Sequence, residues 1–153
     1  MSKQLSAGAF ARENQIAEAW VADVMAELQT KQQPEGIAAI RAALHALRDR
    51  LSTNEAAQLA AQLPLVIRGL FYEGWNPRPA IRRERRLEAF LEHVRQELSD
   101  GRHYLEPERA ASAVFAVLAR RVSPGEIRDV IASLPQRLRG LWPAALGAEM
   151  PAN

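Results

Sequence analysis

Apolar residues recur every three or four positions along most of the chain, a spacing that places them on one face of a helix. Ile16, Trp20, Val24 and Leu28 form the first such stripe. No segment alternates apolar and polar residues with a period of two, and the β-branched residues do not cluster as they do in strands. The pattern therefore predicts an all-α fold. Further apolar stripes run through residues 37–51, 87–98 and 114–122.

Two short sequences predict where helices begin. Residues 52–55 read Ser-Thr-Asn-Glu and residues 123–126 read Ser-Pro-Gly-Glu, which is the spacing of a capping box. In that motif the serine oxygen accepts from the glutamate N–H, and the glutamate side chain accepts from the serine N–H. Pro64 and Pro135 then end each short helix and begin another, because proline disfavours helical geometry in the residue before it. The expected short helices are residues 53–62 and 124–133.

The chain also contains an internal repeat. Residues 50–71 align with residues 121–142 without a gap, and the shared residues include both capping serines, both prolines and the sequence Arg-Gly-Leu. Weaker matches continue upstream. Two halves of this size are each marginal alone, so we expect them to share one core. The sequence thus predicts a pseudo-symmetric helical bundle of two tandem four-helix repeats.

The domain limits follow from this repeat. We expect a single helical domain over residues 11–146, with repeat one at 13–73 and repeat two at 82–144. Residues 1–10 and 147–153 are interpreted as flexible tails.

The repeated Arg-Gly-Leu sequence has a structural interpretation. Glycine inside a short helix costs stability unless another segment packs close to it. We expect Gly69 and Gly140 to let short helices of the two halves approach each other, with Phe71 and Trp142 in the core.

Two blocks of the repeat resemble a known protein family. The block AQLP…RGLFYEGW lies within residues 61–75, and the block SPGE…LRGLW lies within residues 123–142. Both look like the bacterial domain of unknown function 2267 family, and the resemblance covers roughly residues 11–146. It implies an all-helical fold in a bacterial protein, and it supplies no reaction, cofactor or catalytic residue.

Composition narrows the cellular setting. The 153 residues are 48% hydrophobic and 25% charged, as expected for a globular chain, and they include no cysteine. Disulfides, cysteine nucleophiles and cysteine metal sites are therefore excluded. No apolar run approaches the roughly 20 residues of a membrane helix, and the N-terminal residues lack the apolar core of a secretory signal. We expect a cytoplasmic protein without membrane contact.

The sequence contains no catalytic motif. Its three histidines, His45, His93 and His103, form no metal-binding pair, although Glu97 follows His93 by one helical turn. We interpret that pair as a surface histidine beside a surface glutamate. Glycine-rich phosphate loops and nucleophile motifs are also missing. The sequence predicts a non-catalytic protein without metal or cofactor.

Two features are candidates for binding. A basic run over residues 78–86 carries five arginines and a single acid, Glu84, in a chain of net charge +2. These arginines either neutralise phosphates or belong to a solvated helix start that pairs with nearby glutamates. The other feature is the aromatic corner of Tyr72, Glu73 and Trp75. It has no counterpart in the second half, so the shared packing of the repeats does not explain it.

We therefore expect a non-catalytic interaction or small-ligand-binding module that uses the aromatic corner, with a protein partner or self-association. The alternative is binding of nucleic acid or another polyanion through residues 78–86. The candidate binding residues are Arg68, Tyr72, Glu73, Trp75, Arg82, Arg83, Arg85 and Arg86.

Overall fold

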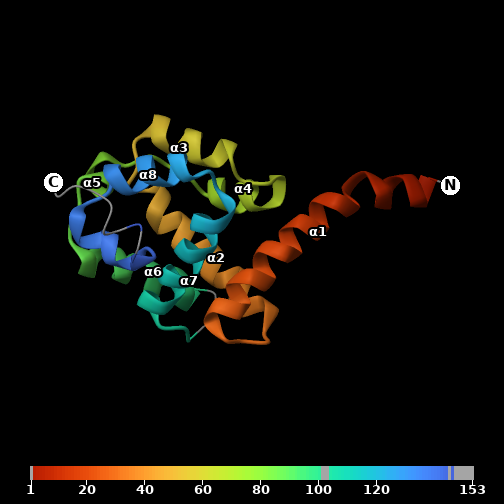
Figure 1. Cartoon of the computed structure of the whole chain (residues 1–153), viewed down its shortest axis with the longest axis horizontal. Coiled ribbons are helices and arrows are strands. Elements are labelled where there is room, and N and C mark those ends of the chain that lie inside the picture. Colours follow the sequence, from red (N-terminus) through yellow and green to blue (C-terminus); the bar gives the residue numbers. More distant parts are fainter. Residues whose placement is uncertain (1, 101–103, 145, 147–153) are drawn as a thin grey trace.

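The fold is known from a computed structural model, which describes residues 2–100, 104–144 and 146. All regular structure in this part of the chain is helical, which confirms the predicted fold class (Figure 1). The helices are α1 (Ser2–Leu28), α2 (Gln33–Arg48), α3 (Thr53–Ala61), α4 (Leu65–Tyr72), α5 (Pro79–Arg82), α6 (Leu87–Asp100), α7 (Pro107–Arg121), α8 (Pro124–Ser133) and the 3-10 helix η1 (Gln136–Leu141).

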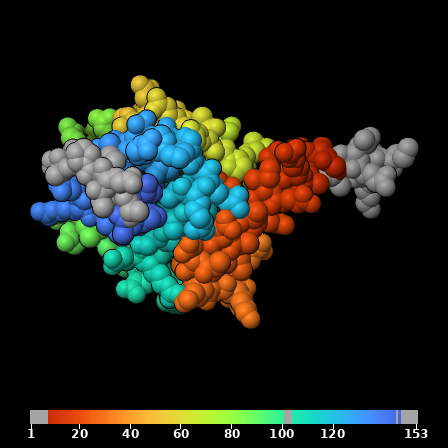
Figure 2. All heavy atoms as spheres, viewed as in Figure 1, coloured from red at the N-terminus to blue at the C-terminus, as the bar shows by residue number. Residues whose placement is uncertain are grey.

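The N-terminal helix is longer than the apolar stripe that predicts it. Residues 2–10, which we expected to form a tail, belong to α1, and this end of the helix projects away from the other helices (Figure 1). In the space-filling view the coloured N-terminal part of α1 also extends away from the rest of the molecule (Figure 2). Phe10 on the projecting part is 61% exposed. The expected tail at 147–153 and His103 lie outside the described residues.

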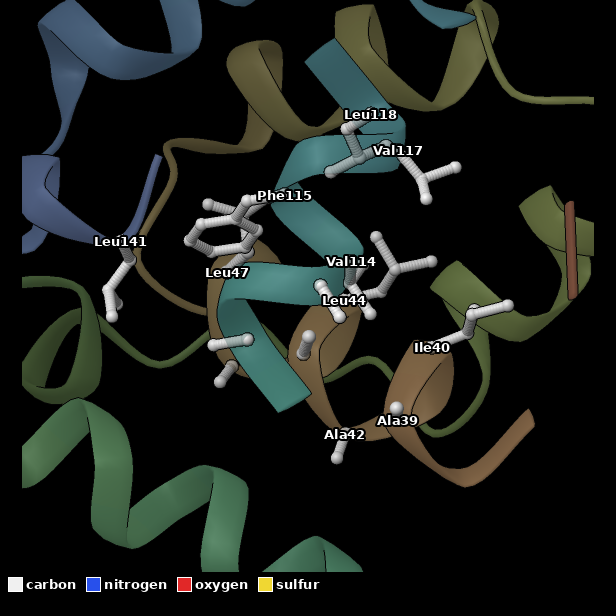
Figure 3. Close-up of a cluster of buried hydrophobic side chains, with 14 of the residues drawn as sticks. Ala39, Ile40, Ala42, Leu44, Leu47, Val114, Phe115, Val117, Leu118 and Leu141 are labelled. Carbon is white, nitrogen blue, oxygen red and sulfur yellow. The ribbon is translucent and has the colours of Figure 1, made fainter. Parts of the chain in front are cut away.

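Helices α2 and α7 form the centre of the molecule. They pack against each other, and α1 and α6 each contact both of them. Four alanines of α2 and three of α7 are buried, and small side chains let helix axes approach closely. Larger side chains such as Leu44 and Phe115 fill the space around them (Figure 3). The ring of Phe115 also stacks on Trp142, with 4.3 Å between the ring centroids.

The short helices pack onto this centre. Helix α3 lies beside α8, α4 packs on α2, and η1 packs on α7 (Figure 1). Both expected serine caps are present, since Ser52 accepts from the N–H of Glu55 and Ser123 accepts from the N–H of Glu126. The reciprocal bond of the capping box forms only at Ser52. The N–H of Ser123 instead donates to Oε1 of Gln62, because α3 lies within reach.

The interpretation of two glycines as close-approach points is wrong. A Cβ placed on Gly69 or Gly140 would meet no atom within 4 Å, whereas Phe71 and Trp142 are buried as expected. The close approach occurs instead at Gly36 of α2, where a Cβ would lie 2.8 Å from Cγ of Met25 on α1.

Candidate functional site

A polar cleft of about 510 Å³ opens where the end of α2, the segment joining α4 to α5, and α6 come together. The joining segment turns at Gly74, whose φ of 66° lies in the left-handed region that favours glycine. The charged residues that line the cleft are Arg48, Asp49, Arg50, Arg78, Glu84 and Glu97, together with His93.

Arg48 joins the end of α2 to the aromatic corner. Its Nη1 atom donates to the carbonyl oxygens of Phe71 and Glu73, each at 2.8 Å, and its Nε atom donates to Asp49 at 2.9 Å. This charged side chain can be buried because it donates hydrogen bonds to carbonyl oxygens that are left without a helical partner at the C-terminal end of α4. Arg48 therefore fixes the position of the segment that follows α4.

Arg50 is held just as firmly from the other side. Its Nη1 atom lies 3.0 Å from the carbonyl oxygen of Ala46 and 3.0 Å from Nδ1 of His93, and its carbon Cζ lies 5.1 Å from the ring centre of Phe90. A guanidinium group only donates, so Nδ1 of His93 accepts and the proton of that ring sits on Nε2. The protonated nitrogen of His93 then lies between Asp49, at 3.8 Å, and Glu97, at 3.7 Å.

A second histidine stands behind Glu97. The buried His45 places Nε2 at 2.7 Å from the carbonyl oxygen of Leu70 and Nδ1 at 3.0 Å from Oε2 of Glu97. Burial would raise the pKa of Glu97, but hydrogen bonds from His45 and His93 and the positive charge of His45 outweigh it and lower this pKa to about 2. Glu97 is thus a carboxylate at neutral pH.

The cleft lining holds three arginines and three carboxylates, so its formal charges balance, but the ion pairs are unevenly distributed. Asp49 pairs with Arg48, Glu84 with Arg86, and Glu97 with His45. Each lining carboxylate therefore has an ion-pair partner, two of which, Arg86 and His45, lie outside the lining, and within the described residues Arg50 and Arg78 form no ion pair. Burial lowers the pKa of Arg50, although the charges of Asp49 and Glu84 oppose this shift. Arg78 is exposed and makes no side-chain hydrogen bond or ion pair within the described part of the chain.

The candidate residues of the aromatic corner have mixed roles. Arg68 donates to the carbonyl oxygens of Ala60, Ala61 and Leu63, so its guanidinium group caps the end of α3. The rings of Tyr72 and Trp75 pack together with centroids 5.4 Å apart, and both are half-buried against the core. Glu73 pairs with Arg41 at 2.6 Å.

The arginine run is divided between two smaller hollows. Arg78 and Arg82 share a hollow of about 130 Å³ with Trp75. Arg85 and Arg86 line another hollow, of about 280 Å³, with Arg137 of η1. Arg83, also exposed, donates to the carbonyl oxygen of Pro79. The structure therefore brings Trp75 to Arg82 but places Arg85 and Arg86 in a different hollow.

Sequence reasoning missed most of the cleft. His93 and Glu97, which we interpreted as surface residues, are partly buried, with side chains 21% and 28% exposed. Their one-turn spacing was a signal, but their burial comes from α2, which no local pattern reveals. The signal in the sequence is weaker for Arg48 and Arg50. These two charged residues lie in the last turn of the apolar stripe over residues 37–51.

The described residues contain no group of three or more histidine, aspartate or glutamate side chains placed to hold a metal ion. Among the same residues, every helix is too short or too polar to cross a membrane.

Comparison with known proteins gives a family. No curated protein is similar enough to the chain to count as a relative. The model of an uncharacterised conserved protein family, DUF2267, matches residues 17–141. That match covers both halves and every helix that lines the cleft, and the chain belongs to the DUF2267 family.

Proposed function

We propose that this protein is a non-catalytic module that binds a small anionic molecule in the cleft between α2 and α6. The observation that carries the proposal is the pairing within the cleft: each lining carboxylate has an ion-pair partner, whereas the guanidinium groups of Arg50 and Arg78 have none among the described residues. A carboxylate or phosphate ligand would pair with these groups and accept hydrogen bonds from them.

The rigidity of the site supports the same proposal. Arg48 and Arg50 are fixed by backbone carbonyls, so little side-chain entropy would be lost on binding. Arg78 is exposed at the edge of the cleft and is free to close on a ligand. A volume of about 510 Å³ falls in the usual range of small-molecule sites.

The aromatic corner has a supporting place in this proposal. Its backbone accepts from Arg48, and Trp75 packs on Tyr72, so the corner holds the segment that carries Gly74, Asn76 and Arg78 to the cleft. We keep a protein partner or self-association at the outer side of the corner as an expectation from the sequence.

We also infer that the bundle is a pseudo-symmetric duplication. Helices that match in the two halves, α2 with α7 and α3 with α8, pack against each other. We further propose a bacterial and cytoplasmic protein, the first because the family resemblance implies it and the second from the sequence features given above.

Two experiments test the proposed ligand class. Native mass spectrometry of freshly purified protein, compared with the denatured mass, detects a ligand that is carried through purification. Thermal unfolding with inorganic phosphate or citrate then measures stabilisation by mass action. We expect at least one anion to raise the unfolding temperature of the wild type, and Arg78→Gln to remove most of that rise.

Arg12→Gln is the matched control, because it removes one exposed arginine on α1, outside the cleft. Equal stabilisation of wild type, Arg78→Gln and Arg12→Gln would indicate a general salt effect and contradict the proposal. The absence of any stabilisation or carried mass would contradict it as well.

A further inference from the structure

The highest density of arginines in the sequence lies on α5 and the segments on either side of it, of which Arg78 and Glu84 also line the cleft. Residues 78–86 carry five arginines and one acid, and Glu84 is paired with Arg86 at 2.9 Å. Within the described chain, no side-chain hydrogen bond or ion pair engages Arg82 or Arg85. An uncompensated basic segment of this kind attracts a polyanion.

The fold adds an arginine that the sequence run does not contain. Arg137 of η1 lines the same hollow as Arg85 and Arg86, although it lies about fifty residues later in the chain. Arg137 is exposed and, like Arg85, has no acidic partner among the described residues. Three guanidinium groups from two elements therefore border one hollow of about 280 Å³.

The other end of the segment offers an aromatic ring beside its arginines. Trp75, Arg78 and Arg82 line the hollow of about 130 Å³ at the start of α5. Cationic groups that follow a backbone, together with an aromatic side chain on which a base can stack, are the usual elements of single-strand recognition.

We propose that these two hollows form a surface for the phosphodiester backbone of a single-stranded nucleic acid. Two separate basic hollows on one continuous segment match a ligand with repeated phosphates better than a ligand with one. Helix α5 has four residues and is too short to act as a recognition helix in the major groove of a duplex. Binding is therefore expected to depend on charge and stacking and to be independent of sequence.

This surface shares Arg78 with the cleft, so the test uses other residues. Arg85 and Arg137 do not line the cleft between α2 and α6. Changing them tests the surface and leaves the cleft residues in place.

The test is fluorescence anisotropy with a labelled oligothymidylate of about 20 nucleotides, which exceeds the site of one small domain. The full chain is titrated between about 50 mM and about 200 mM salt. The test variant is Arg85→Gln with Arg137→Gln. The control is Arg12→Gln with Arg128→Gln, which loses the same charge from exposed positions outside both hollows.

We expect the test variant to bind at least about tenfold more weakly than the control, with a salt slope lower by about 1.4 because two phosphate contacts are lost. An equal loss of affinity in the two variants would show that binding depends only on net charge, and it would overturn the proposal. It would also be overturned if the wild type failed to bind the oligonucleotide at low salt, or if it bound only heparin or a duplex. Circular dichroism confirms that each variant is folded.

Discussion

Nδ1 of His45 lies 3.0 Å from a carboxylate oxygen of Glu97, and this contact ties α2 of the first half of the chain to α6 of the second. Nε2 of the same ring lies 2.7 Å from the carbonyl oxygen of Leu70, which can only accept. Both ring nitrogens must carry a proton for both bonds to form. The imidazolium ring of His45 then bridges α2, α4 and α6.

The first prediction concerns the pH dependence of stability at Glu97. Its pKa in the folded protein is about 2, below the value of about 4.3 for an unperturbed glutamate. A lowered folded-state pKa means that this carboxylate stabilises the fold above about pH 5, and that the contribution is lost as the pH falls towards 2. We expect Glu97→Gln to cost about 1 to 3 kcal/mol near pH 6, as for a lost charged hydrogen bond.

Urea unfolding at a series of pH values measures this effect. The difference between wild type and Glu97→Gln is expected to shrink as the pH falls from about 5 to about 2. Glu88→Gln, on the exposed side of the same helix, is the control and is expected to stay within about 0.5 kcal/mol of wild type. A difference between wild type and Glu97→Gln that did not change with pH would contradict the assignment.

The second prediction is that two glycine-to-alanine changes have opposite signs. In Gly69→Ala the new methyl group meets no atom within 4 Å, so the change is expected to stabilise the protein by about 0.5 to 1 kcal/mol through helix propensity. In Gly36→Ala the methyl group lies 2.8 Å from Cγ of Met25 and 3.3 Å from the carbonyl oxygen of Val21. We expect that overpacking to cost about 1 to 3 kcal/mol.

The free energy of unfolding in urea distinguishes these signs, and each variant serves as the control for the other. Loss of stability in Gly69→Ala would restore the interpretation of that position as a close contact between helices. An unchanged stability in Gly36→Ala would show that α1 and α2 can separate at little cost.

Local signals made part of the structure predictable, and tertiary contacts decided the rest. The start of α3 at Thr53 follows from the Ser52 cap, because both partners of the capping box lie within one turn. The same motif at Ser123 forms only in part, since Gln62 from the other half takes its N–H. A sequence pattern contains no information on that neighbour.

The cleft likewise depends on tertiary contacts that local patterns do not predict. The one-turn spacing between His93 and Glu97 predicts that they share a helix face, but it does not predict that α2 covers this face. Arg137 joins Arg85 only after the fold brings η1 to the start of α6. The local runs of charge were visible in the sequence, whereas the sites depend on contacts between its halves.

The third prediction separates structure from binding at Arg68. Its Nε and Nη2 atoms donate to the carbonyl oxygens of Ala60 and Leu63, each at 2.9 Å, and so cap α3. Arg68→Met keeps the aliphatic stem and loses these donors, which is expected to cost about 1 to 2 kcal/mol in urea unfolding. Binding of phosphate or oligothymidylate by the folded variant is expected to be unchanged. A folded variant with intact stability and weaker binding would return Arg68 to the binding surface.

The last prediction concerns the bond between the two halves at Gln62 and Ser123. Nε2 of Gln62 donates to Oγ of Ser123 at 3.0 Å, and the N–H of Ser123 donates to Oε1 of Gln62 at 2.9 Å. Because both residues are exposed, we expect Gln62→Ala alone to cost less than about 1 kcal/mol. A double-mutant cycle with Ser123→Ala is expected to give a coupling energy of about 0.5 to 1 kcal/mol. Ser133, which bonds only within α8, provides the control, and its change to alanine is expected to add to Gln62→Ala without coupling. Ser123→Ala keeps the backbone N–H, so additivity of Gln62 and Ser123 would show that the bond between their side chains contributes nothing to stability.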